Sequence, residues 1–271
     1  MVVMVMDVVT KTMVTVIGVI IMVIVKTAAE IKKLREAGRL SALALKVGGE
    51  AVVPGVTTAE IDRVIHDFIV KNGATPSFLN LYGFPASACI SVNDELIHGI
   101  PGNRVIQEGD IVTIDVGACL DGYHGDNAAT FAAGTPSEEA RRLMDVTRES
   151  LFKGIEMATA GNRIGDISNA VQTYCEERGY SVVREYVGHG VGRQVHEDPE
   201  VPNYGKPGHG VRLVNGMVIA IEPMINAGTR FVVQDNPNGW TVRTKDGKLC
   251  AHFENTIAIT PNGPLILTDP N

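Results

Sequence analysis

The stretch DIVTIDVGACLDGYHGD, residues 110–126, decides the fold of this chain. Large apolar side chains alternate with threonine and aspartate over residues 111–116, which is typical of a buried β-strand. The Asp-Gly dipeptide at 121–122 favours a two-residue turn into a second, antiparallel strand. The sequence therefore predicts a long hairpin inside a sheet.

Two aspartates of this hairpin lie on one face. With the turn at 121–122, Gly117 pairs with Asp126, and Asp115 lies diagonal to Asp126. Diagonal neighbours are about 7–8 Å apart at the backbone, so both carboxylates can reach metal ions that lie about 3.5–4 Å apart. A pair of solvated carboxylates is the alternative. We favour metal ligands because Asp115 lies in an apolar strand, where a carboxylate needs a partner.

Two helices are expected before the hairpin. Thr27 with Glu30, and Thr57 with Glu60, each have the spacing of a capping box. Apolar residues follow both pairs at helical spacing, and Asn-Gly at 72–73 ends the second helix.

A similar order is expected in the second half. The segment TPSE at 135–138 opens a third helix with Pro136 at its first position. Asp166 caps a fourth helix that ends near Gly179. Strands are expected over residues 217–222, 231–234 and 252–260. The repeated order predicts an α+β fold with two similar halves and a site between them, in one domain over residues 22–271.

Two glutamates lie in apolar, strand-like segments of the second half. Glu222 ends the segment MVIAIE, and Glu254 lies in HFENTIAI. In both segments the face of the carboxylate carries small residues, and the opposite face carries large apolar residues. A carboxylate on such a strand needs a metal ion or an ion pair.

Two histidines flank a glycine-rich loop in GHGVGRQVHEDP, residues 188–199. The pattern is not a GxGxxG nucleotide loop, and His196 does not begin an HExxH motif because Glu200 stands in place of the second histidine. A structural role is the alternative for both His189 and His196, and His209 is expected in a loop. Four carboxylates and one imidazole form a donor set that suits Mn, Fe, Co or Zn.

Together these segments resemble the type I methionine aminopeptidases, a family with the pita-bread fold. The resemblance extends from about Ile24 to Thr268. It implies two pseudo-symmetric helix-helix-strand halves around a central antiparallel sheet. The matching segments are CISVNDELIHGIP (89–101), IDVG (114–117), GYHGD (122–126), GHGVG (188–192), HEDP (196–199), IEPM (221–224) and FENT (253–256).

The resemblance implies a centre with two divalent metal ions. Asp126 and Glu254 are implied to bridge both ions, Asp115 to bind one ion, and His189 with Glu222 to bind the other. The ions activate a water molecule for attack on the first peptide bond of the substrate.

Three residues are implied to be catalytic. Glu222 takes a proton from the water and passes it to the leaving amine. His98 and His196 face the substrate, and His196 donates a hydrogen bond to the carbonyl oxygen as it gains charge.

The pocket for the methionine side chain is implied to include Phe84, Cys89 and Trp240. Phe78 and Leu81 stand where the family pattern has cysteine and tyrosine. The pocket therefore differs in detailed shape and keeps its apolar character, which suits a thioether.

The implied activity is removal of the initiator methionine from nascent polypeptides. Two alternatives stand beside it. A prolidase-like aminopeptidase on the same fold usually carries a separate N-terminal domain. A catalytically inactive peptide-binding module usually lacks metal ligands, whereas all five positions are filled here. Only 26 positions separate His196 from Glu222, which excludes the inserted helical subdomain of type II enzymes.

The composition is that of a globular protein. Of the 271 residues, 45% are apolar and 20% are charged, and the net charge of −7 without a basic stripe argues against nucleic-acid specificity. The cysteines are widely spaced, which favours free thiols in a reducing cytoplasm over zinc clusters or disulfides. They are Cys89, Cys119, Cys175 and Cys250.

Residues 1–21 form an N-terminal extension that we expect to be dispensable. The uncharged run at 13–25 is rich in Val and Ile, which favours a strand, and it is short for a membrane span. An upstream start codon is preferred over a membrane tether or a signal peptide, because no cleavage site follows the run. The further expectations are a cytoplasmic monomer without stable membrane insertion that works near the ribosomal exit tunnel.

Overall fold

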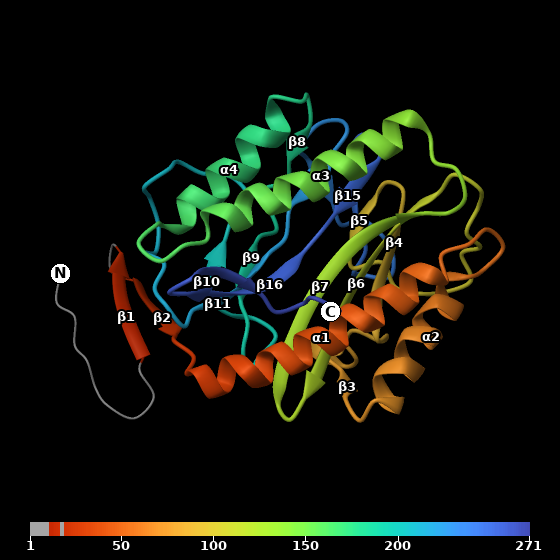
Figure 1. Ribbon diagram of the computed structural model, residues 1–271. Coiled ribbons are helices and arrows are strands. Elements are labelled where there is room, and N and C mark those ends of the chain that lie inside the picture. The colour runs from red at the N-terminus through yellow and green to blue at the C-terminus, as the bar shows by residue number, and fades with distance from the viewer. Residues whose placement is uncertain (1–10, 17–18) are drawn as a thin grey trace.

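The computed structural model describes the backbone of residues 11–16 and 19–271, and the side chains from Met22 onward. In this part of the chain there are four α-helices and one short 3₁₀ helix. They are α1 (Ala28–Glu50), α2 (Thr58–Lys71), η1 (Leu81–Gly83), α3 (Glu138–Met157) and α4 (Ile164–Glu176). Figure 1 shows α1 with α2, and α3 with α4, as two pairs, with β7, β16 and β11 between them.

The strands of the described residues pair antiparallel. The first-half sheet contains β3 (Thr75–Pro76), β6 (Ile111–Leu120) and β4 (Ala88–Val92), and β7 (Tyr123–Ala132) also pairs with β6. The second-half sheet has the order β10 (Glu197–Val201), β9 (Gly188–Gly190), β11 (Val218–Ile221), β16 (Asn255–Thr260), β17 (Gly263–Ile266).

Three smaller sheets complete the strand layer. One contains β15 (Cys250–His252), β12 (Met224–Asn226) and β8 (Ser181–Val182). Another contains β13 (Val232–Val233), β14 (Val242–Thr244) and β5 (Glu95–Ile97). The third is the hairpin of β1 (Lys11–Val16) and β2 (Val19–Ile24). The expected α+β organisation, with a helix pair and a sheet in each half, is confirmed.

The β6–β7 hairpin has the predicted register. Leu120 pairs with Tyr123 across the turn, and Gly117 pairs with Asp126. Asp115 pairs with Cys89 of β4 on its other side. The two aspartates are therefore diagonal neighbours on β6 and β7, as expected.

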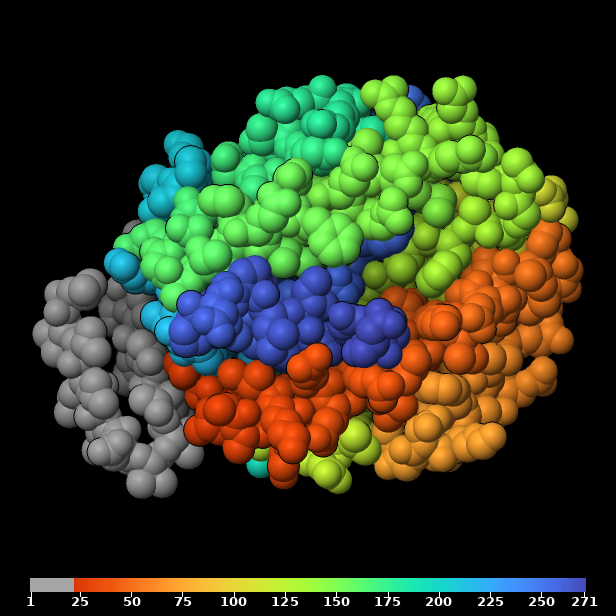
Figure 2. Space-filling model, in the orientation of Figure 1, coloured from red at the N-terminus to blue at the C-terminus, as the bar shows by residue number. Residues whose placement is uncertain are grey.

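Helix α1 lies directly on this hairpin. A Cβ atom on Gly125 would lie 2.3 Å from the Cα of Gly38, so only glycine allows this close approach. Gly38 also contacts the C-terminal segment, because a Cβ there would lie 2.6 Å from the carbonyl oxygen of Leu267. Figure 2 shows this C-terminal segment at the surface between α1 and the second helix pair. The contacts fix α1 next to Asp126.

The two faces predicted for the second-half strands pack into different cores. Ile219 and Ile257 belong to the core beneath α3 and α4. Val218, Ala220 and Ala258 pack with Leu34 of α1. The strand predicted over 252–260 is interrupted, since β15 ends at His252 and β16 begins at Asn255. Glu254 thus lies at a break between strands rather than within one.

The helix starts of the first half are confirmed. Thr27 and Thr57 are the N-caps of α1 and α2, each in a complete capping box. Asn72 follows the last residue of α2.

Two predicted starts in the second half are wrong. The N-cap of α3 is Ser137, so Pro136 precedes the helix instead of opening it. The N-cap of α4 is Arg163, and Asp166 lies three residues inside the start, where its Oδ2 accepts from the Arg163 N–H. The Ser137 hydroxyl accepts a hydrogen bond from the free N–H of Ala140, which explains why α3 begins after Ser137.

The uncharged run at 13–25 contributes to the β1–β2 hairpin, so its strand character is confirmed for the described backbone. Expectations for residues 1–10 and 17–18 fall outside the described residues. No helix in the described part of the chain has the length and apolar character needed to cross a membrane.

Candidate metal centre and substrate cavity

A cavity of about 820 Å³ opens between the two halves. It has a wall of carboxylates and imidazoles and a wall of apolar side chains. All of the residues that the sequence predicts for the site line it: His98, Asp115, Asp126, His189, His196, Glu222, Glu254, Phe84, Cys89 and Trp240. The structure therefore brings together groups spread over more than half of the sequence.

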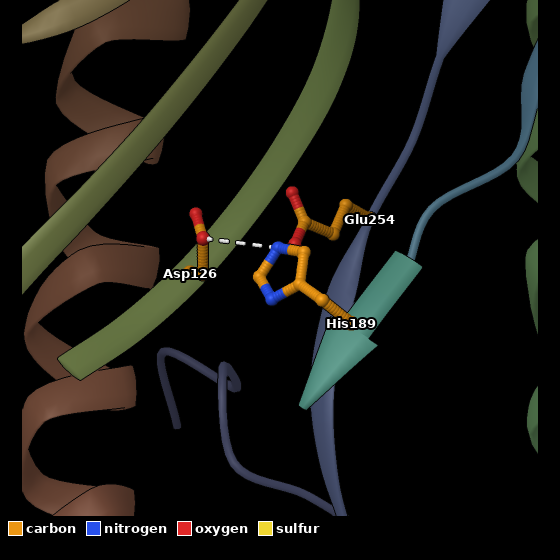
Figure 3. A group of neighbouring side chains, drawn as sticks. All are labelled: Asp126, His189 and Glu254. Atoms are coloured by element: carbon orange, nitrogen blue, oxygen red, sulfur yellow. Dashed lines mark ion pairs between the residues drawn. The ribbon is translucent and has the colours of Figure 1, made fainter. Parts of the chain in front are cut away.

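Asp126, His189 and Glu254 form the centre of the polar wall. One possible ligand atom from each lies within 4.8 Å of those from the other two. Figure 3 shows the three side chains pointing toward one another from β7, from β9 and from the segment between β15 and β16. This convergence is what a shared cation requires.

Thr256 fixes Asp126 relative to Glu254. Its hydroxyl donates to the carbonyl oxygen of Asp126 at 2.7 Å and accepts from the Asp126 N–H at 3.2 Å. The N–H of Glu254 donates to the carbonyl oxygen of Ala128 at 2.9 Å. These bonds join β7 to β16 across the two halves of the protein.

His189 presents Nε2 to the carboxylates. Its Nδ1 lies 2.9 Å from the carbonyl oxygen of Gly190, which can only accept, so Nδ1 carries the proton. Nε2 lies 3.8 Å from Asp126 Oδ2 and 3.5 Å from Glu222 Oε1. Burial, together with the charge of His196, lowers the pKa of His189 to about 4. The neutral ring thus directs a lone pair at the cluster, which is the form that binds metal.

The carboxylates of the cluster repel one another in a buried place. Burial raises the pKa of Asp115 to about 7. Burial, followed by repulsion from neighbouring carboxylates, raises the pKa values of Asp126, Glu222 and Glu254 well above their ordinary range. Such groups need cations to stay ionised at neutral pH.

Three of these carboxylates also have oxygens without hydrogen-bond partners among the described residues. They are Oδ1 of Asp115, Oδ1 of Asp126 and Oε1 of Glu254, all buried. Native proteins rarely leave such atoms unsatisfied. Unpartnered oxygens beside a neutral imidazole fit divalent metal ions.

His252 is a cavity residue that the sequence analysis missed. Its Nε2 lies 3.6 Å from Glu222 Oε2, and burial followed by the charge of His98 lowers its pKa to about 3. Neither ring nitrogen has a hydrogen-bond partner within the described residues. The sequence feature that could have indicated it is its position two residues before Glu254, a candidate ligand.

The two histidines expected to face the substrate both line the cavity and have different ring neighbours. The His196 ring is 4.4 Å from that of His189. The His98 ring lies edge-on to Trp240 at 6.3 Å. His98 has a left-handed backbone, with φ of 57°, which is uncommon outside glycine and is often found at functional sites. Burial, together with His196, lowers the pKa of His98 to about 4.

The apolar wall is a continuous cluster. Phe84 meets Trp240 edge-on at 5.2 Å, and Cys89 is buried beside them. Phe78 and Leu81, which depart from the family pattern, belong to the same cluster. The pocket is apolar, as expected, with these two side chains in its wall.

Residues 32–261 match the sequence model of metallopeptidase family M24. The chain belongs to metallopeptidase family M24. A methionine aminopeptidase from Clostridium perfringens is 58% identical over 247 residues, which cover 91% of this chain and 99% of that protein. The expected family and enzyme class are thereby confirmed.

Solved structures agree with the family assignment. Methionine aminopeptidase from Rickettsia prowazekii has a TM-score of 0.90 and 42% identity, and the match covers 92% of this chain and 100% of that chain. A prolidase from Pyrococcus furiosus has a TM-score of 0.73 and 26% identity, and the match covers only 66% of that longer chain. The pita-bread fold is confirmed, and the similarity favours the aminopeptidase over the prolidase.

Proposed function

We propose that this M24 metallopeptidase removes the N-terminal methionine from nascent polypeptides, using two divalent metal ions. The observation that carries the proposal is the meeting of two walls in one cavity. A buried carboxylate and histidine cluster with unpartnered oxygens faces an apolar pocket lined by Phe84, Cys89 and Trp240. The first wall suits peptide-bond hydrolysis, and the second suits a thioether side chain.

The metal ligands in this proposal are five side chains. Asp115, Asp126, His189, Glu222 and Glu254 would hold the two ions. When bound, the ions supply Lewis-acid polarisation of the scissile carbonyl and lower the pKa of the attacking water. The unpartnered oxygens of Asp115, Asp126 and Glu254 support this assignment.

The side chains of the protein supply the proton transfers and orientation. Glu222 takes the proton of the attacking water and delivers it to the leaving amine. His98 and His196 are neutral because burial lowers their pKa values, so each can donate one N–H to substrate oxygen. A donor aimed at the developing oxyanion typically contributes about 10²–10³ in kcat.

The substrate preference is tested with matched peptides. The metal-loaded protein is expected to release methionine from Met-Ala-Ser and to leave an Ala-Pro peptide intact. Cleavage of Ala-Pro without cleavage of Met-Ala-Ser would support the prolidase alternative. Failure to cleave either peptide while metal is bound would support the inactive peptide-binding module.

A cytoplasmic location, a monomeric state and action near the ribosomal exit tunnel are part of the proposal. An enzyme acting on nascent chains works where they emerge. Light scattering tests the monomer, and cosedimentation with translating ribosomes tests the association.

A further inference from the structure

Lys26 and Glu197 form a buried ion pair beside the candidate site. Lys26 Nζ lies 2.7 Å from Glu197 Oε2, and each side chain is only 5% exposed. The two residues are 171 positions apart in the sequence. Lys26 lies between β2 and α1, and Glu197 is the first residue of β10, directly after His196. The pair therefore joins the N-terminal segment to the loop that carries a substrate-facing histidine.

Lys26 is itself held in place through its backbone. Its N–H donates to the carbonyl oxygen of Gly216 at 2.7 Å. Gly216 lies in the turn that leads into β11, the strand that ends just before Glu222. The main chain of Lys26 thus contacts the turn before β11, which leads to Glu222. Its side chain contacts Glu197, the residue after His196.

Glu197 closes the loop of residues 192–197. Its Oε1 accepts the backbone N–H of Gln194 at 3.2 Å. A Cβ atom on Gly192 would lie 2.3 Å from this oxygen, so the loop packs directly on the carboxylate. On the other side, the His124 N–H donates to the Gly192 carbonyl oxygen at 3.0 Å. The backbone of the loop therefore packs against the carboxylate that forms the ion pair with Lys26.

The His196 ring depends on this loop. Among the described residues its ring takes part in no hydrogen bond, and its centroid lies 4.4 Å from that of the His189 ring and 5.9 Å from that of the Tyr82 ring. Tyr82 is 77% exposed, so it forms a weak support. Together with the ring of His189, the backbone of residues 192–197 therefore determines where the imidazole lies.

We propose that Lys26 is a positioning residue that sets the orientation of His196 through the carboxylate of Glu197. This inference rests on the proposed role of His196 in the reaction. A displacement of about 1 Å at a substrate-facing group can cost about 100-fold in rate. Loss of the ion pair should therefore act on turnover more than on substrate binding or metal content.

The first test separates positioning from charge balance. Lys26→Met alone leaves Glu197 as a buried, uncompensated charge, which destabilises a protein. The double variant Lys26→Met with Glu197→Gln removes both charges, and the new amide oxygen can still accept the Gln194 N–H. We expect kcat of this double variant to fall about tenfold or more, with KM changed less than about threefold. Metal content, measured by mass spectrometry, should stay at the parent level.

Two further variants serve as controls. Lys26→Arg keeps the positive charge, so its kcat should be higher than that of the Lys26 and Glu197 double variant. Lys153→Met removes the lysine of an exposed pair with Glu156, whose side chains are 46% and 62% exposed, and should leave kcat unchanged.

A double-mutant cycle with His196→Ala decides whether Lys26 acts through that ring. In the His196→Ala background, adding the Lys26 and Glu197 changes should lower kcat no further. An additional loss equal to that in the parent protein would overturn the inference, as would parent-level kcat in the Lys26 and Glu197 double variant. If His196→Ala itself leaves kcat unchanged, the proposed role of His196 is wrong, and this inference is wrong with it.

Discussion

The hydroxyl of Thr256 binds both backbone polar groups of Asp126, donating to its carbonyl oxygen at 2.7 Å and accepting from its N–H at 3.2 Å. Asp126 comes from the first half of the chain, and Thr256 lies two residues after Glu254 in the second half. One fully buried side chain therefore sets the spacing between the two carboxylates proposed to share the metal ions.

Replacing Thr256 tests this relationship. Thr256→Val keeps the shape of the side chain but leaves the Asp126 N–H and C=O without these partners, whereas Thr256→Ser keeps the hydroxyl. Because outer hydrogen bonds that orient ligands typically contribute about 10–100-fold in metal affinity, we expect a loss in this range for the valine variant. The serine variant should bind metal nearly normally. Competition with a fluorescent chelator measures both, and equal affinity in the two variants would contradict the assignment.

Asp126 is the proposed ligand whose loss should reduce activity most. Asp126→Asn removes a charge from the centre of the cluster while keeping its size, and it should abolish measurable methionine release. Asp145→Asn is the matched control, because Asp145 lies in an exposed pair with Arg148. Near-normal turnover by Asp126→Asn, measured with Met-Ala-Ser, would exclude the proposed centre with two metal ions.

The buried carboxylates should make the metal-free protein less stable as the pH rises through about 7. Burial and mutual repulsion hold the pKa values of Asp126, Glu222 and Glu254 well above those of the unfolded chain. In this range the folded state therefore binds more protons than the unfolded state, and its stability declines with pH. Asp115, with its pKa raised to about 7, contributes mainly between pH 4 and 7.

The buried histidines act in the opposite direction, but at lower pH. Burial lowers the pKa values of His98 and His189 to about 4 and that of His252 to about 3. Their effect is a gain of stability with rising pH that is half complete near pH 6.5, the pKa of unfolded histidine, and complete about one pH unit above it. Thermal unfolding of the metal-free protein should thus give a lower Tm at pH 8 than at pH 7, and added Mn²⁺ should reduce this difference. A higher Tm at pH 8 without metal would contradict the raised carboxylate pKa values.

The N-terminal boundary gives a further prediction. A chain that begins at Met22 keeps Lys26 and the buried Val23, so it should fold and cleave Met-Ala-Ser like the full chain. A chain that begins at Thr27 lacks the buried Val23 and leaves Glu197 without its ion pair, so it should be less stable and lose most of its activity. Insolubility or loss of activity in the chain that begins at Met22 would show that residues 1–21 are part of the working enzyme.

The sequence could predict the hairpin because its information is local. The Asp-Gly turn at 121–122 and the two-residue period of the strand set the pairing of Gly117 with Asp126, and the period then places Asp115 diagonally. The helix starts at Thr27 and Thr57 were predictable for the same reason, since both residues of each capping box lie within one turn.

Contacts between residues far apart in the chain could not be predicted from local sequence patterns. The contact of Lys26 with Glu197 depends on how the two halves close, and a lone lysine before a helix gives no local sign of a buried partner. His252 was missed because its contact with Glu222 also joins segments far apart in the chain. The break that separates His252 from Asn255 follows from tertiary bonds such as that of the Glu254 N–H with Ala128.

The most direct test is a metal titration of methionine release. The protein is first stripped with a chelator, and free methionine from Met-Ala-Ser is then measured while Mn²⁺ or Co²⁺ is returned in known amounts. We predict no release by the stripped protein, and recovery that saturates when about two ions per chain are bound. Full release by the stripped protein, or metal binding without any release of methionine, would contradict the account.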